Sequence, residues 1–221
     1  MKPAVCVIFV CLLAAAAVHS GNSKWTRVAT FRGYPVEVFD PGTDEDGFEP
    51  LGSASICVLL TSTRQCYTPA NKNGLAFGRE PRAAVVNLGP DFDAILFRAD
   101  SGGVSGWLRS LALVRINEAG GKTLKNLLPR QTVVSNQSEY DFWAEPGISS
   151  RKILVVADYQ WGDGEGHYDA HRYKVSTYVY GNAGAFRLRD EYMTRKKYDL
   201  EMEHVLIKER DEILARLRQR R

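Results

Sequence analysis

Short segments rich in β-branched and aromatic residues recur along most of the chain, and this recurrence constrains the fold more than any other feature. Gly, Pro, Asn or Asp bounds each segment, as is typical of β-strands and the turns between them. The linkers are too short for the crossover helices that join parallel strands, so the sequence predicts a mainly β fold, an antiparallel β-sandwich or a partly open barrel. Residues 24–40 hold two such segments, and the others are 53–60, 83–88, 93–99, 110–116, 131–135, 152–159, 171–180 and 185–194.

The last segment, residues 199–221, follows a different period. Leu206, Ile213 and Leu217 fall on one helical face, and charged residues occupy most of the rest. The segment begins with acidic residues and ends with basic ones, which complements the helix dipole. The sequence therefore predicts one C-terminal amphipathic α-helix that packs on, or extends from, a β-rich domain of residues 21–198.

The N-terminus has the pattern of a secretory signal peptide. A lysine precedes an apolar run over residues 4–18, and small residues surround Ser20, after which we expect cleavage. The run is shorter than the roughly 20 residues that a transmembrane helix needs, and no other apolar run approaches that length. The sequence therefore predicts a signal peptide over residues 1–20 and a secreted or periplasmic protein without a transmembrane segment in the mature chain.

Cysteine usage agrees with export. Cys6 and Cys11 lie inside the signal peptide, so the mature chain keeps Cys57 and Cys66. A strand-turn-strand pattern separates these two, and in an oxidising compartment they predict one local disulfide that pins a hairpin. The alternative of a redox-active pair is disfavoured, because the spacing is not Cys-x-x-Cys.

The charge balance argues against nucleic acid as a partner. The chain has 29 Lys and Arg residues against 26 Asp and Glu residues, a net charge of +3. Domains that bind nucleic acid usually concentrate an excess of basic residues on one face or along one helix. No nucleic-acid partner is therefore expected.

The stretch ADYQWGDGEGHYDAHRYKV, residues 157–175, gathers acidic residues, glycines and histidines between two predicted strands. Asp158, Asp163 and Glu165 offer hard oxygen ligands, and the intervening glycines let the backbone curl, as calcium sites require. The spacing does not match an EF-hand loop. The plainer alternative is a solvated hairpin loop.

Two histidines in the same stretch raise the possibility of zinc. In an extended chain, His167 and His171 would stand about 13 Å apart, so a shared ion requires a turn at residues 169–170. The alternative places His171 on the following strand as a half-buried residue paired with a carboxylate or carbonyl. The sequence thus gives a candidate calcium or zinc site formed by Asp158, Asp163, Glu165, His167 and His171.

Aromatic residues supply the second functional clue. Tyr140, Trp143, Trp161 and Tyr168 lie in or beside predicted loops, and rings next to polar groups often anchor glycans or peptides. No nucleophile elbow, HExxH motif or phosphate-binding loop occurs, so the set of catalytic residues is incomplete. The leading hypothesis is a binding module for an envelope or extracellular protein or a glycan.

The alternative function belongs to another class. A metal-dependent hydrolase would use Asp163, Glu165, His167 and His171, with a carboxylate as general base beside the metal. This alternative requires that the loop binds a calcium or zinc ion.

Two stretches of the chain resemble each other, and the sequence does not decide between duplication and chance. The stretches ILFRADSGGVSGW and ILVVADYQWGDGEGH share Ile-Leu-x-x-Ala-Asp followed by a glycine-rich loop, and Ile95 and Ile153 are 58 residues apart. The similarity indicates either a duplicated hairpin unit or chance resemblance between strands. A closed propeller needs about four or more such units, which favours the sandwich or partial barrel.

Overall fold

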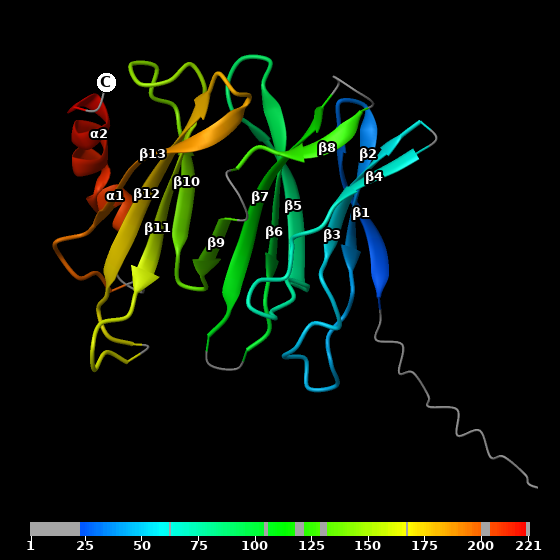
Figure 1. Cartoon of the computed structure of the whole chain (residues 1–221), viewed down its shortest axis with the longest axis horizontal. Coiled ribbons are helices and arrows are strands. Elements are labelled where there is room, and N and C mark those ends of the chain that lie inside the picture. The colour runs from blue at the N-terminus through cyan, green and yellow to red at the C-terminus, as the bar shows by residue number, and fades with distance from the viewer. Residues whose placement is uncertain are drawn as a thin grey trace, which may run out of the picture.

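The computed structural model describes residues 23–61, 63–103, 106–117, 122–128, 132–166, 168–199 and 204–219. Within these ranges, thirteen strands form three antiparallel sheets (Figure 1), which confirms the mainly β prediction. The predicted signal peptide lies outside the described residues. None of the described helices is long and apolar enough to span a bilayer. The strands are β1 (Lys24–Phe31), β2 (Tyr34–Asp40), β3 (Ser55–Leu60), β4 (Thr63–Tyr67), β5 (Arg79–Asn87), β6 (Asp93–Asp100), β7 (Leu108–Asn117), β8 (Thr123–Asn126), β9 (Thr132–Ser135), β10 (Glu139–Trp143), β11 (Ile153–Gln160), β12 (Arg172–Gly181) and β13 (Ala185–Met193).

Each sheet is built from strands that are consecutive in the chain. The first sheet has the order β1-β2-β3-β4, the second β5-β6-β7-β8, and the third β10-β11-β12-β13. In the second sheet, β8 pairs with the C-terminal half of β7 and β9 pairs with its N-terminal half. Neighbouring strands of each sheet run antiparallel, so a turn or a loop is enough to join one strand to the next.

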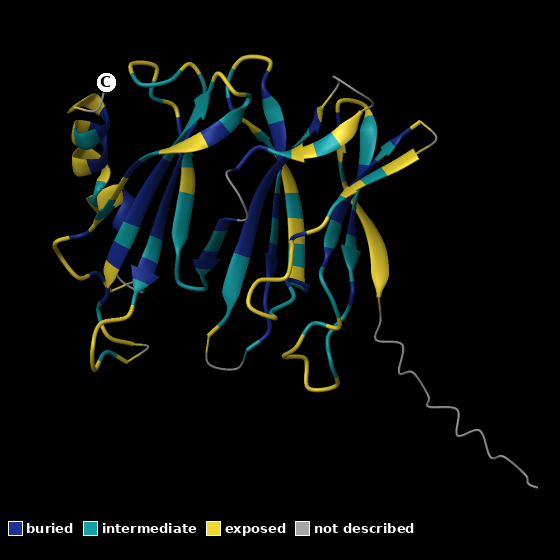
Figure 2. Cartoon of the chain, viewed as in Figure 1, coloured by how far each residue is buried: buried dark blue, intermediate teal, exposed yellow. Residues whose placement is uncertain are grey.

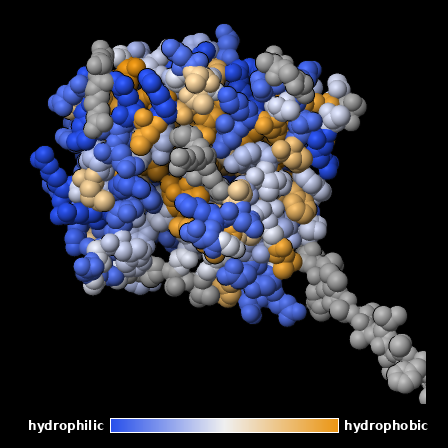
Figure 3. Space-filling view, in the orientation of Figure 1, coloured by the Kyte–Doolittle hydropathy of each residue, from blue (hydrophilic) through white to orange (hydrophobic). Residues whose placement is uncertain are grey.

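The three sheets stack face to face, so the sandwich has three layers. Alternate residues of β7 face opposite cores, because successive side chains of a strand point to opposite sides. Ala112 and Val114 pack toward the first sheet, whereas Leu111 and Leu113 pack toward the third. The second sheet is therefore buried on both faces, and exposed residues gather on β1, the loops and the outer side of the helices (Figure 2). Hydrophilic residues cover most of the face shown in Figure 3.

The chain ends in two short helices, α1 (Val205–Lys208) and α2 (Arg210–Gln219), which cover the outer face of the third sheet. Ile213 and Leu217 of α2 are each 1% exposed and belong to the same core as Val175 of β12. Arg216 also donates to buried Asp190 of β13, at 2.7 Å. The predicted C-terminal helix is confirmed, although it begins later than position 199.

The predicted disulfide is present. Cys57 of β3 and Cys66 of β4 lie directly opposite each other, with their Cα atoms 4.1 Å apart. Closing this ring of ten residues stabilises the fold by about 2.7 kcal/mol in the chain-entropy model.

The internal similarity corresponds to equivalent positions in the fold. Ile95 and Ile153 lie on β6 and β11, each the second strand of its sheet. Both strands carry an aspartate near their end, Asp100 and Asp158, and β2 ends in the same way at Asp40, 60 residues before Asp100. Each sheet thus contains one run of four up-and-down strands, β1–β4, β5–β8 or β10–β13, which we call a repeat, and β9 is added to the second sheet.

A long loop follows the second strand in each repeat. These loops are residues 41–54, 101–107 and 161–171. All three lie at the same edge of the stack, at the bottom of Figure 1. We call this side the long-loop edge, and it carries the candidate site.

Candidate functional site

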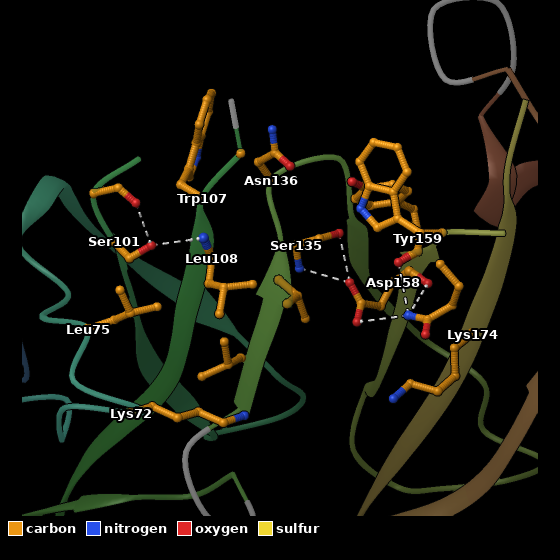
Figure 4. A pocket seen from close by; sticks show the side chains of 16 residues that line it. Lys72, Leu75, Ser101, Trp107, Leu108, Ser135, Asn136, Asp158, Tyr159 and Lys174 are labelled. Carbon is orange, nitrogen blue, oxygen red and sulfur yellow. Dashed lines mark hydrogen bonds between the residues drawn. The ribbon is translucent and has the colours of Figure 1, made fainter. Parts of the chain in front are cut away.

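A groove of about 730 Å³ opens between the second and third sheets at the long-loop edge (Figure 4). Its volume falls within the roughly 300–1,000 Å³ that is usual for ligand sites. The two walls come from different repeats, so residues far apart in sequence meet there. The lining residues are Lys72, Leu75, Ser101, Gly102, Gly106, Trp107, Leu108, Val133, Val134, Ser135, Asn136, Asp158, Tyr159, Gln160, Trp161 and Lys174.

The wall on the second sheet is organised by Asp100 at the end of β6. Its carboxylate, 5% exposed, accepts two hydrogen bonds from Arg109, at 2.7 and 2.8 Å. It also accepts one from Trp107 Nε1, at 2.9 Å, which fixes the indole beside the groove. The hydrogen bonding of the Arg109 guanidinium to the Asp100 carboxylate raises the pKa of Arg109 above its usual value. Asp100 is therefore a structural anchor that positions Trp107.

The loop after Asp100 is tightly folded. Ser101 donates to the carbonyl of Gly102 and accepts from the backbone N–H of Leu108, at 3.1 and 3.0 Å. A Cβ at Gly103 would lie 2.4 Å from the carbonyl oxygen of Gly106, so this position requires glycine. Ser101 thus serves the turn, as expected for a glycine-rich β loop.

The wall on the third sheet is organised by Asp158 of β11. Its carboxylate accepts hydrogen bonds from the N–H and hydroxyl of Ser135, at 2.8 and 2.9 Å, and from the hydroxyl of Ser138, at 2.6 Å. Ser135 ends β9, which belongs to the second sheet. Asp158 therefore ties the second and third sheets together at the base of the groove.

Three rings support one another beyond Asp158. The ring of His171 lies 5.0 Å from that of Tyr159 and 5.3 Å from that of Trp161, in edge-to-face geometry. His171 and Tyr159 are buried, whereas Trp161 is 51% exposed. The two buried rings thus hold a half-exposed indole at the side of the groove opposite Trp107. Edge-to-face packing of this kind is favourable for aromatic groups.

Glu165 fastens the loop that carries Trp161. Its two carboxylate oxygens lie 2.6 Å from Lys197 Nζ and 2.8 Å from His171 Nδ1. The backbone N–H of Gly162 donates to the same carboxylate at 2.7 Å. Hydrogen bonds from Lys197, then His171 and then Gly162, lower the pKa of Glu165 from 4.5 to about 2. We call this arrangement the Glu165 clamp.

Acid titration should reveal the Glu165 clamp. The folded-state pKa of Glu165, about 2, lies below its ordinary value of 4.5, so the carboxylate contributes its full stability above pH 4.5 and loses it as the pH falls toward 2. The Glu165→Gln variant lacks this ionisation and should lose less stability than the wild type over this window. Urea unfolding at several pH values measures the difference. Parallel pH profiles for the two proteins would contradict the clamp.

The structure separates the residues of the predicted metal site. Asp158 bonds to serines, Asp163 is exposed, and Glu165 pairs with His171 and Lys197. Within the described ranges, no three His, Cys, Asp or Glu side chains form a group that could hold a metal ion. His167 lies outside the described residues, so the calcium or zinc site and the hydrolase that depends on it remain predictions.

The four predicted binding aromatics have different environments. Trp161 and Tyr168 are exposed, but Tyr140 and Trp143 lie on strand β10 and not in a loop. Trp143 is only 6% exposed, its Nε1 donates to Asp141 at 2.9 Å, and Arg210 of α2 covers its ring. The expectation that Trp143 is an exposed anchor was therefore wrong, because the C-terminal helix covers it. Tyr140 is half-buried and accepts from Arg98 at 3.3 Å.

Sequence reasoning missed Trp107, Lys72 and Lys174. A signal for Trp107 was present, because Trp107 follows Asp100 in one repeat as Trp161 follows Asp158 in the next. Comparisons with known proteins add no functional residue: no family model, curated protein or solved structure matches the chain. The chemistry of the groove is therefore the basis for assigning a function.

Proposed function

We propose that the protein is an exported binding module and that the groove at the long-loop edge binds a glycan. The observation that carries this proposal is the alternation of rings and hydrogen-bonding groups in one concavity. Trp107 and Trp161 flank the groove, and Ser135, Asn136 and Gln160 lie between them. Indole faces pack well on the C–H face of a sugar ring, and amide and hydroxyl groups can bond its hydroxyls.

The shape of the site favours a glycan over a protein partner. A stable protein interface usually buries about 1,600 Å² around apolar anchors, and a bound peptide usually pairs with a strand edge or fills apolar pockets. Here Tyr159 is buried and Trp107 half-buried, so the rings form the walls of a narrow groove with polar groups between them. A chain of sugar rings fits this distribution of groups.

Export is supported by two independent features. Residues 1–20 have the pattern of a signal peptide. The Cys57–Cys66 disulfide is the kind of bond that persists in an oxidising compartment. A secreted or periplasmic location would place the groove among envelope or extracellular polysaccharides.

Alanine substitution of Trp161 tests the proposed site. A screen of immobilised glycans and peptidoglycan fragments should find a ligand, and Trp161→Ala and Trp107→Ala should each weaken its binding about tenfold or more. Trp25→Ala is the matched control, because Trp25 is 43% exposed on β1 and does not line the groove. Surface plasmon resonance gives the dissociation constants. Equal affinities for all three variants, or capture of proteins but no glycan, would refute the proposal.

A further inference from the structure

Two lysines enter the groove from opposite walls. Figure 4 shows the ammonium ends of Lys72 and Lys174 directed toward the space between the second and third sheets. Lys72 comes from the loop between β4 and β5, and Lys174 comes from β12. Lys72 belongs to no segment that the sequence analysis assigned to a site, whereas Lys174 lies near the end of the stretch 157–175.

The position of Lys72 is fixed by a tight turn. Its backbone N–H and carbonyl both bond to Leu75, at 3.2 and 3.0 Å. The two residues between them, Asn73 and Gly74, have φ values of 54° and 80°. An Asn-Gly pair with positive φ at both positions is the preferred sequence of a two-residue hairpin turn. The turn thus presents Lys72 and Leu75 side by side to the groove.

The position of Lys174 is fixed by the sheet. It lies on a central strand, between Asp158 of β11 and Met193 of β13 in register. Lys174 is half-buried and lines the groove. The positive charge of Lys174 therefore lies in the groove.

The two lysines of the groove have no ion-pair partner among the described residues. Among the described residues, neither Lys72 nor Lys174 takes part in an ion pair or a side-chain hydrogen bond. Among the described residues that line the groove, Asp158 is the one acidic residue; its carboxylate accepts hydrogen bonds from Ser135 and Ser138, and the two lysines leave an excess of one positive charge. A concave site with an excess of one charge concentrates ligands of opposite charge.

We infer that the ligand of this groove is an acidic glycan whose carboxylates bind between Lys72 and Lys174 while Trp107 and Trp161 pack on its sugar rings. This inference rests on the proposed function and adds the charge of the ligand to it. A uronic acid combines a flat C–H face with a carboxylate on one ring, so one ligand meets both the indoles and the amines. Lysine binds such an anion as a point charge without demanding one geometry.

Matched acidic and esterified glycans test the inference. Polygalacturonate, alginate and hyaluronan oligosaccharides, each as the free acid and as its methyl ester, are titrated into the mature protein by calorimetry. At least one free acid should bind, and its ester should bind about tenfold more weakly. Added salt should weaken binding of the acid but not of the ester, because salt screens the lysine charges.

Lysine variants identify the residues responsible. Lys72→Met and Lys174→Met should each weaken binding of the free acid about tenfold and leave the ester unaffected. Lys125→Met is the control, because Lys125 is exposed on β8 and does not line the groove. Circular dichroism confirms that each variant is folded.

The outcomes separate the inference from the proposed function. Equal binding of acid and ester, or lysine variants that bind the acid like the wild type, would overturn the acidic ligand and leave the glycan site standing. The same holds if only a neutral glycan binds and Trp161→Ala weakens it. Absence of binding to every glycan, acidic or neutral, would overturn the proposed function itself.

Discussion

The Asp100→Ala variant should lose about 3 kcal/mol of its free energy of unfolding. Asp100 is buried at the end of β6 and accepts hydrogen bonds from Arg109 and Trp107. Its removal leaves the Arg109 guanidinium without its counterion, and breaking a buried ion pair in this way costs about 3–5 kcal/mol. The lower end of this range applies, because 18% of the Arg109 side chain is exposed and water can solvate part of it.

Urea unfolding followed by tryptophan fluorescence measures this loss. The melting temperature should fall by about 6–12 °C, since each kcal/mol shifts it by roughly 2–4 °C in a domain of this size. Asp93→Ala is a matched control at the other end of β6, where Asp93 accepts one exposed hydrogen bond from Asn87. The control should change stability by less than about 0.5 kcal/mol. Similar losses for both variants would show that Asp100 is not an anchor.

The Ile213→Ala variant should be destabilised by about 3 kcal/mol. Ile213 is 1% exposed and packs in the core between α2 and the third sheet. Truncation of a buried isoleucine loses the transfer free energy of the removed groups and leaves a cavity, which together cost about 2–5 kcal/mol. The helix thus contributes to folding as the fourth layer of the stack.

An exposed isoleucine on the neighbouring helix provides the control. Ile207 of α1 is 69% exposed, so Ile207→Ala should change the free energy of unfolding by less than about 0.5 kcal/mol. Both variants can be compared by urea unfolding under the same conditions. Equal effects at the two positions would mean that α2 does not pack on the third sheet in solution.

Much of the fold could be predicted from the sequence, because strand periodicity and linker length are local properties. The number of layers in the stack could not be predicted from the sequence. A strand buried on both faces reads as a continuous apolar run, and LALVRI in β7 has this character, but the run does not say which sheets cover it. The stacking of three sheets depends on contacts such as Leu111 with the third sheet, which are distant in sequence.

The candidate site was predictable only in part. The loop of residues 161–171 was identified, yet the carboxylates in and just before it bind distant partners: Asp158 of β11 reaches Ser135, and Glu165 reaches Lys197. Lys72 and Lys174 share a groove because two sheets stack, and no local pattern reports that pairing. Trp143 was misassigned because its burial depends on a helix that follows much later in the chain.

The arrangement of the three loops has a consequence for how ligand preference can change. Each repeat contributes one loop to the same edge, while the hydrophobic cores lie within the stack. Loops on a rigid scaffold tolerate insertions and substitutions better than the elements they connect. Lengthening the exposed parts of the loops 41–54, 101–107 and 161–171 therefore offers a modular route to new specificities, provided that buried residues such as Ala54 and His171 are kept.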